Sequence, residues 1–379
     1  MIKINNKFKL VRNLALASVG LMSLASCDAF KDDLPTCPKA QMQMTFTWNM
    51  DFIDRFQDDV HCIDVYIFNV VGTKVGENYE TKFFTYAELN EDQIKAGNNS
   101  VDLNAHLKPG ETLSEGKYIA VIYGGNNCSL TSFDKTFTVD ENLTLQDLSL
   151  HLNESKYDNP NLTESERGDL ELHDSFFGIQ EFDVKANQLT NTVVDLKRNT
   201  NKIHVNMYYK DQVTTFNDIN DYSLEIVDDN NDLLFNNRVD ETGEVTYRPF
   251  EKSLVNSNKN HNSTFSLSRL VIDGNENLPE LRIANNNPKT KADGEPQYIQ
   301  LTEDGSPWKL IDHIKQSDRY KDFLNNYKSN IDNDQNLQEY LDRNYDWYID
   351  IALGEYNGFI TASVTVRPWD VRNDEFEAQ

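Results

Sequence analysis

Hydrophobic and polar residues alternate with a period of two at both ends of the part of the chain that is predicted to fold. Residues 41–48 read QMQMTFTW, so Met and aromatic residues fall on one face and Gln and Thr on the other. Residues 359–366 read FITASVTV and alternate in the same way from Ile360 onward. This period is typical of a β-strand with one buried face. We therefore predict a half-buried strand in each segment.

Short runs rich in β-branched and aromatic residues, bounded by Gly, Pro, Asn or Asp, predict further strands. In the first half of the chain these runs are residues 63–68, 101–106, 116–123, 137–139, 176–184 and 193–196. In the second half they are residues 202–208, 222–227, 245–247, 265–271, 298–301 and 345–352. The Asn-rich and Lys-rich stretches 252–264 and 284–294 are predicted to be exposed loops. Many short strands separated by turn signals predict a mainly β protein built from β-sandwiches.

One region departs from the strand pattern. Ser306 suits the N-cap of a helix, and Pro307 suits its first position. An approximate apolar stripe follows at residues 310, 311, 314, 323, 324 and 327, with a break near Ser317 and a second short helix at 337–341. We predict an N-terminal β-sandwich domain over residues 40–198. A C-terminal β-sandwich domain is predicted over 199–379, with a helical insertion at about 306–342.

The first 26 residues have the layout of a secretory signal peptide. Lys3, Lys7, Lys9 and Arg12 precede an apolar run at residues 14–25, and no acidic residue occurs before position 28. The run is shorter than the roughly 20 residues that cross a bilayer, and no later segment approaches that length. We therefore predict an exported chain without a transmembrane helix.

The end of this leader, Leu24-Ala25-Ser26-Cys27, resembles a bacterial lipobox. That resemblance implies signal cleavage between Ser26 and Cys27 and acylation of Cys27, because several acyl chains anchor a protein firmly where one does not. The alternative is an ordinary signal peptide. Residues 27–39 then form a lipidated tether. Its lysine and acidic residues resemble the surface-export signal of Bacteroidales lipoproteins, and the alternative is a solvated acidic tether.

The charge balance limits the partners of the exported chain. The whole chain has a net charge of −26, and removing residues 1–26 leaves 32 Lys and Arg against 62 Asp and Glu, a net charge of −30. Such a surface repels nucleic acid, which basic patches are needed to bind. We therefore predict no nucleic-acid partner. The 17 Tyr, 20 Phe and 4 Trp supply apolar material for a core, which argues against a disordered chain.

Cysteine use is consistent with an exported protein but does not fix a disulfide. If Cys27 carries lipid, Cys37, Cys62 and Cys128 remain, and one of the three has no partner within the chain. An oxidising compartment permits one disulfide. Sequence alone does not choose the pair. No CxxC spacing indicates a metal site.

Other residue types that carry chemistry do not form a convincing site in the sequence. The run HDS at 173–175 contains triad residue types, but neighbours in sequence lack the convergent geometry of a triad, and we interpret the run as a loop before a strand. Asp332 opens a calcium-like loop, yet Leu337 and Arg343 stand where the loop needs Gly and Glu. The acidic run 228–232 is predicted to cap a hairpin. We predict no catalytic residue, metal site or cofactor, and leave a weak surface calcium site open.

Seven short motifs occur in an order that resembles the minor fimbrium anchoring subunits of Bacteroidales, the fimbrillin-associated lipoproteins of type V pili. The motifs are DLPTCP at 33–38, VYIF at 65–68, GKYIAVIYGG at 116–125, DSFFG at 174–178, VDLKRNTNKIHV at 194–205, YLDR at 340–343 and VTVRPW at 364–369. Each motif is weak by itself, and their order is specific. The resemblance covers essentially the whole chain after the leader.

The resemblance implies two transthyretin-like or immunoglobulin-like β-sandwich domains and a non-enzymatic task. It implies a lipid-anchored, surface-exposed protein of the outer membrane that fixes the base of the fimbrium and limits its length. The implied partners are the major shaft subunit and other fimbrial subunits, bound by β-strand complementation. Shaft subunits of that system lose their first strand to cleavage after an arginine, whereas an anchor would keep residues 41–48 in its own sheet.

The C-terminal end of the chain differs from that of a subunit that donates a separate hydrophobic strand to its neighbour. Only ten mostly polar residues follow Trp369, so any strand given to a shaft subunit would be 359–366 itself. Two alternatives to the anchor stay open. One is a fimbrial tip or accessory adhesin of the same fold. The other is a surface lipoprotein that binds or degrades glycans.

Overall fold

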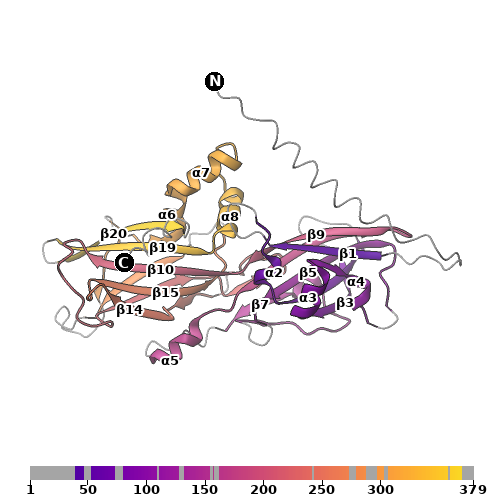
Figure 1. Cartoon of the computed structure of the whole chain (residues 1–379), viewed down its shortest axis with the longest axis horizontal. Coiled ribbons are helices and arrows are strands. Elements are labelled where there is room, and N and C mark those ends of the chain that lie inside the picture. The colour runs from indigo at the N-terminus through magenta and orange to yellow at the C-terminus, as the bar shows by residue number, and fades with distance from the viewer. Residues whose placement is uncertain are drawn as a thin grey trace, which may run out of the picture. The chain divides into compact units, whose positions relative to one another are not determined.

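The computed structural model describes residues 39–46, 53–72, 80–108, 111–127, 132–153, 157, 162–240, 243–272, 279–286, 297–302, 306–356 and 359–368 (Figure 1). All of them belong to one compact unit, residues 38–379. The fold is mainly β with few short helices, as the sequence pattern predicts. Among the described residues no helix is long and apolar enough to cross a membrane.

A seven-stranded sheet in the order β3-β2-β5-β8-β9-β1-β4 is built entirely from the first half of the chain. Its strands are β1 (Lys39–Phe46), β2 (Cys62–Val70), β3 (Thr81–Leu89), β4 (Ser100–Asp102), β5 (Gly116–Gly125), β8 (Ser175–Val184) and β9 (Leu189–Arg198). The β8 and β9 strands pair only at Phe176–Arg198 and Phe177–Lys197. Beyond those pairs the sheet divides into two layers, with β3, β2, β5 and β8 in one and β9, β1 and β4 in the other.

The two layers enclose a hydrophobic core, which is the defining feature of a β-sandwich. Every second residue of β2 and β5 points into it, as the strand period requires. The core residues from these strands and from β8, β1 and β9 are Ile63, Val65, Ile67, Tyr118, Ala120, Ile122, Phe176, Phe182, Val184, Ala40, Met42, Val194 and Leu196. Short helices α2 (Phe56–Asp59), α3 (Glu91–Gly97) and α4 (Leu103–His106) contribute Phe56, Ile94 and Leu103.

Gly178 allows the two layers to approach each other closely. A Cβ atom built at this position would lie 2.6 Å from both Leu196 Cδ2 and Val194 Cγ1. We expect Gly178→Ala to destabilise the protein by about 1–3 kcal/mol, because the well-packed core must shift to admit the methyl group. Urea unfolding followed by circular dichroism measures the change. Gly168→Ala is a suitable control, since its added Cβ would meet nothing within 4 Å, and an equal loss in both variants would contradict the packing argument.

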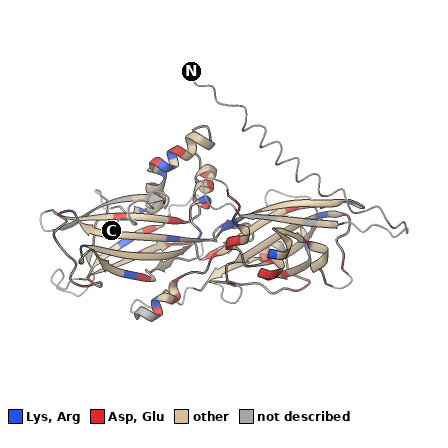
Figure 2. Ribbon diagram, in the orientation of Figure 1, with Lys and Arg blue, Asp and Glu red and all other residues tan. Residues whose placement is uncertain are grey.

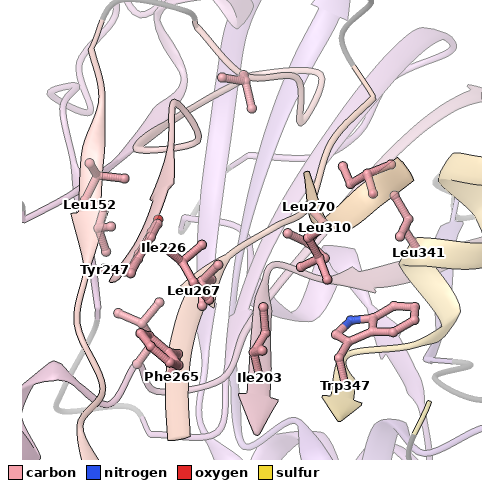
Figure 3. Close-up of a cluster of buried hydrophobic side chains, with 14 of the residues drawn as sticks. Leu152, Ile203, Ile226, Tyr247, Phe265, Leu267, Leu270, Leu310, Leu341 and Trp347 are labelled. Atoms are coloured by element: carbon pink, nitrogen blue, oxygen red, sulfur yellow. The ribbon is translucent and has the colours of Figure 1, made fainter. Parts of the chain in front are cut away.

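The second half of the chain forms two further sheets. One has the order β14-β15-β10-β19-β20, and its strands are β14 (Glu251–Val255), β15 (Asn260–Ser268), β10 (Thr200–Tyr209), β19 (Asp346–Tyr356) and β20 (Phe359–Pro368). The other has the order β13-β11-β16-β17, with β18 beside β16. Its strands are β13 (Val245–Tyr247), β11 (Tyr222–Asp228), β16 (Glu280–Asn285), β17 (Gln297–Tyr298) and β18 (Trp308–Lys309). The two sheets share a core that includes Ile203, Ile226, Phe265, Leu267 and Trp347 (Figure 3).

The helices of the second half follow β18. They are α6 (Leu310–Gln316), α7 (Asp318–Tyr327) and α8 (Asp334–Arg343), which lie together on one side of the sheet that holds β19 and β20 (Figure 1). The predicted break is present, because Ser317 ends α6 and its side chain accepts a hydrogen bond of 3.2 Å from the Tyr320 N–H. The predicted start at Ser306 is wrong. Trp308 and Lys309 pair with β16 instead, so strand pairing overrides the local Ser-Pro signal.

A small sheet connects the two halves. It has the order β12-β7-β6, with β6 (Phe133–Lys135) and β7 (Ser149–Leu152) from the first half and β12 (Asp232–Leu234) from the second. The core of the second half also continues into the first, where Tyr66, Phe177 and Leu152 belong to the same cluster of buried residues. Short helices α5 (Glu164–Arg167), η1 (Leu145–Asp147) and η3 (Gly168–Leu170) lie in this connecting region. The boundary between two domains at residue 198 therefore stays a prediction.

Several predicted segments differ from the structure for identifiable reasons. Residues 103–106 form α4 and not a strand, because Asp102 accepts the Asn104 N–H and caps a helical turn. The predicted loop 252–264 is the β14–β15 hairpin, whose turn places Asn256, Ser257 and Asn258 at positive φ. Residues 137–139 are not a strand, and β6 lies four residues earlier. Strands β3 and β16 were not predicted, since their apolar patterns are irregular.

Candidate functional site

Strand β1 is an interior strand of its sheet. It pairs in parallel with β9 over its whole length, from Lys39–Leu189 to Phe46–Leu196. On its other side Gln41, Met42 and Gln43 pair with β4 in antiparallel orientation. Residues Thr47 and Trp48, the end of the predicted strand, lie outside the described residues. Because both of its edges are engaged, β1 completes the sheet to which it belongs.

The side chains of β1 close the N-terminal core. Ala40 and Met42 are buried, with 1% and 0% of their surfaces exposed, and they pack in one cluster with Val194 and Leu196. Without β1, this apolar surface and the free edge of β9 would face solvent. Such an open edge beside an apolar groove is what another chain's strand can fill. The apolar groove beside β9 is therefore filled by the protein's own chain.

The last strand lies at the end of another sheet. β20 pairs with β19 in ten successive positions, from Trp347–Pro368 to Tyr356–Phe359. In the sheet order of the described residues, nothing pairs with the other edge of β20. Donation of residues 359–366 to another chain would therefore break a long antiparallel ladder, whereas the outer edge of β20 can accept a strand without breaking one.

The junction between the two halves is polar and buried. Only Asn199 separates β9 from β10, and it is 0% exposed. The guanidinium of Arg198 forms an ion pair with Asp174, donates to Thr200 Oγ1 at 3.2 Å, and stacks over the Tyr345 ring at 3.7 Å from its centroid. The chain therefore crosses between the sheets under close packing rather than through a flexible linker.

Side-chain amides complete the hydrogen bonds of this junction. Asn199 and Asn237 exchange two amide hydrogen bonds of 2.8 Å, and both residues are buried. Asn230 donates to the Arg269 carbonyl at 3.1 Å and accepts a hydrogen bond of 2.6 Å from the Tyr247 hydroxyl. Buried amides are tolerated when they are bonded in this way. The predicted hairpin cap at 228–232 is wrong, because β11 and β12 do not pair with each other, and Asn230 of this run belongs to a buried network instead.

A buried ion pair of the second half is also contacted by a lysine of the first half. Arg269 Nη2 lies 2.7 Å from Asp342 Oδ1 and 2.9 Å from its Oδ2, and both side chains are less than a tenth exposed. Lys197 Nζ, from the first half, lies 2.9 Å from Asp342 Oδ2. Burial alone would raise the pKa of the Asp342 carboxyl, but the charges of Arg269 and Lys197 outweigh it, and that pKa is lowered.

Sequence reasoning missed this junction. Its members come from segments far apart in the sequence, and only the fold brings them together. The one signal was RNTN at 198–201, a polar run between two strands with neither Gly nor Pro, inside the longest motif of the family resemblance. A polar linker of that kind is expected to be exposed. Here it is buried, because other polar groups form hydrogen bonds and an ion pair with it.

The predicted triad-like run lies at a hollow of about 490 Å³, which is also lined by Cys62 and Lys135. Asp174 is held by Arg198, while the backbone N–H of His173 donates to Ser132 Oγ at 2.6 Å. Ser175 is the first residue of β8. These contacts fix the start of a strand, which agrees with our interpretation of the run.

The cysteine and metal predictions are only partly covered by the structure. Cys62 opens β2, and its Sγ lies 3.6 Å from the Gly125 carbonyl oxygen. Ser26, Cys27, Cys37 and Cys128 lie outside the described residues, so the lipidation and the disulfide stay predictions. Asp332 accepts from the Tyr320 hydroxyl at 2.9 Å. Within the described ranges, no group of three His, Cys, Asp or Glu residues is placed to hold a metal ion.

Comparison with known proteins places these features in one family. Solved structures of similar fold include a protein proposed as an adhesin from Bacteroides ovatus (20% identity, TM-score 0.63, covering 91% of this chain and 97% of that one). Another is a protein proposed as an adhesin from Bacteroides thetaiotaomicron (20% identity, TM-score 0.62, covering 86% of this chain and 99% of that one). The fimbrial anchor protein Mfa2 from Porphyromonas gingivalis also has a similar fold (12% identity, TM-score 0.55, covering 88% of this chain and 98% of that one). No curated protein matches the sequence. Residues 34–375 match the family described as fimbrillin-A associated anchor proteins Mfa1 and Mfa2, and the chain belongs to that family.

Proposed function

We propose that this protein is the anchor subunit of a fimbrium, a lipoprotein that fixes the shaft to the outer membrane and limits its length. Membership of the anchor family supports a fimbrial role. The observation that carries the anchor role is the place of β1, which is engaged on both edges and buried at Ala40 and Met42. A subunit whose own strand fills its groove accepts no donor strand there, so a polymer ends at this side.

The shaft is then bound at another surface. We propose that a strand of the shaft subunit adds to the outer edge of β20, because that edge is open in the sheet order and β20 keeps its ten pairs with β19. Backbone hydrogen bonds of a strand added to an edge supply affinity, and alternate side chains supply specificity. Growth from one edge alone produces a single shaft per anchor.

The proposed membrane attachment is the acylated Cys27, followed by the acidic tether. Acyl chains hold the protein at the outer membrane, while the net charge of −30 that remains after removal of the leader keeps the protein away from anionic headgroups. Figure 2 shows that Asp and Glu are distributed over both halves of the fold. The protein is placed by this proposal at the base of the fimbrium, outside the cell.

We expect Cys27→Ser to release the protein from the outer membrane together with its fimbriae, because the acceptor of the acyl chains is lost. Membrane fractionation and electron microscopy of the culture medium measure the release. Ser26→Ala is the matched control, since it leaves the thiol in place and keeps a small residue before the cleavage site. Fimbriae that stay attached in the Cys27→Ser strain would contradict the proposal.

A tip adhesin of the same fold is the second candidate, since two of the similar structures are proposed adhesins. Immunogold labelling of the wild-type strain separates the two. Gold at the cell-proximal end, with longer and detached fimbriae in a deletion strain, supports the anchor. Gold at the distal end, with attached fimbriae in that strain, would assign the protein to the tip.

A further inference from the structure

A solvent-exposed tyrosine stands beside a hollow on the second of the C-terminal sheets. Tyr298 of β17 is 57% exposed, which is unusual for so large a ring at a strand position. It pairs with Ala284 of β16, which in turn pairs with Ser223 of β11. Directly paired residues lie on the same face of a sheet, so the ring has two small side chains beside it. Ala284 is 5% exposed and does not line the hollow, which lies beside the ring on the side of Arg282 and Glu280.

Charged side chains border the same space. Arg282 is two residues from Ala284 on β16 and therefore shares its face, and it pairs with Glu225 of β11. Arg282 Nη2 lies 2.6 Å from Glu280 Oε2. The positive charge of Arg282 is thus balanced by a carboxylate, while its planar group is still 40% exposed and keeps N–H donors for a ligand.

The hollow has a volume of about 440 Å³, within the range of roughly 300–1,000 Å³ that is usual for small-molecule sites. Glu280, Arg282, Tyr298, Gln300 and Trp308 are among its lining residues. Trp308 pairs with Leu281 of β16, so its indole lies on the core face of the sheet, where it is 2% exposed and stacks on His313. The groups that a ligand in the hollow can meet are therefore those of the outer face, Glu280, Arg282 and Tyr298.

We propose that this hollow binds a neutral glycan, with one sugar ring stacked on Tyr298. Sugar rings present an apolar C–H face that packs on an aromatic ring, and their hydroxyls both donate and accept. Arg282 and Glu280 supply a donor and an acceptor side by side, which matches neighbouring hydroxyls. The charge of Arg282 is balanced, and the chain as a whole carries −26, so an acidic glycan is disfavoured.

The test is calorimetric titration of the full secreted chain, made as the Cys27→Ser variant, with laminarihexaose, mannohexaose and cellohexaose. Hyaluronan hexasaccharide and decaproline serve as the acidic and peptide probes. We expect at least one neutral hexasaccharide to bind, and Tyr298→Ala to weaken it about tenfold, a change of about 1.4 kcal/mol. Tyr298→Phe keeps the ring and is expected to bind within about threefold of the wild type, consistent with stacking as the main contribution.

Tyr327→Ala is the matched control, because Tyr327 is 49% exposed but belongs to α7 and does not line the hollow. Its affinity is expected to equal that of the wild type. The proposal is overturned if none of the neutral hexasaccharides binds at millimolar concentration, or if only hyaluronan or decaproline binds. It is also overturned if Tyr298→Ala and Tyr327→Ala lose affinity equally. Fimbrial attachment in a Tyr298→Ala strain is expected to be normal, so this result is independent of the anchor role.

Discussion

A chain that lacks residues 39–46 is expected to lose the fold of its N-terminal sheet and to recover it when the missing strand is added as a peptide. Deletion exposes the groove that Ala40 and Met42 fill and frees the edge of β9. Truncation of Met42 to Ala alone is expected to cost about 2–5 kcal/mol, since the side chain is fully buried. Loss of the whole strand, with its pairs to β9 and β4, costs more than this.

The peptide KAQMQMTF tests whether the groove accepts a strand from outside. Fluorescence anisotropy of the labelled peptide measures its binding to the truncated chain, and thermal unfolding measures the recovery. A peptide with Met42→Asp is the matched control and is expected to fail, because it would bury an unpaired charge. Full-length protein should bind neither peptide, since its groove is occupied. An unchanged melting temperature of the truncated chain would show that β1 is dispensable, and the anchor proposal would lose its main support.

The parts of the fold that follow a strict period could be predicted from the sequence. β1 and β20 alternate cleanly between apolar and polar residues in the sequence, and both were found. β13 was found at its observed bounds, since three residues between turn signals leave little choice. The break at Ser317 followed from capping chemistry, which is local. Local signals of this kind are readable because they depend on neighbours in the chain.

The parts that were missed depend on contacts between distant segments. The β14–β15 hairpin reads as an Asn-rich loop, and it is a hairpin because β15 pairs along its whole length with β10. Likewise β18 replaces a predicted helix start because it pairs with β16. The ion triad of Lys197, Arg269 and Asp342 carries no local signal at all, since Arg269 and Asp342, its buried pair, are 73 residues apart. The candidate site could not be predicted from the sequence for the same reason, because contacts between distant segments form it.

The second large effect is expected at that triad. Asp342→Ala leaves the guanidinium of Arg269 buried at 7% exposure with its acid partner removed. We expect a loss of about 3–5 kcal/mol in the free energy of unfolding, because an uncompensated buried charge is strongly unfavourable. Arg269→Met combined with Asp342→Leu is expected to recover most of that loss, since a buried pair replaced by apolar groups of similar size is often neutral. Urea unfolding at pH 7 measures all three proteins.

The pH dependence gives a check that a simple packing defect would not reproduce. The pKa of Asp342 is lowered in the folded protein, so its ion pairs stabilise the fold above the unfolded pKa of about 4. That contribution is lost as the pH falls through the lower, folded pKa. The difference in stability between wild type and Asp342→Asn is therefore expected to shrink below about pH 4. A difference that stayed constant down to pH 2 would contradict the electrostatic account.

Lys197 provides the control that separates burial from charge. It contacts the same carboxylate, but its side chain is 47% exposed and can turn to water when the partner is removed. We expect Lys197→Met to cost at most about 1 kcal/mol, as exposed ion pairs do. If Lys197→Met were as damaging as Asp342→Ala, the stabilisation would come from the exposed contact of Lys197 and not from the buried pair. With the expected result, the buried pair of Arg269 and Asp342 supplies most of the stabilisation, and Lys197 adds only a weak contact across the junction.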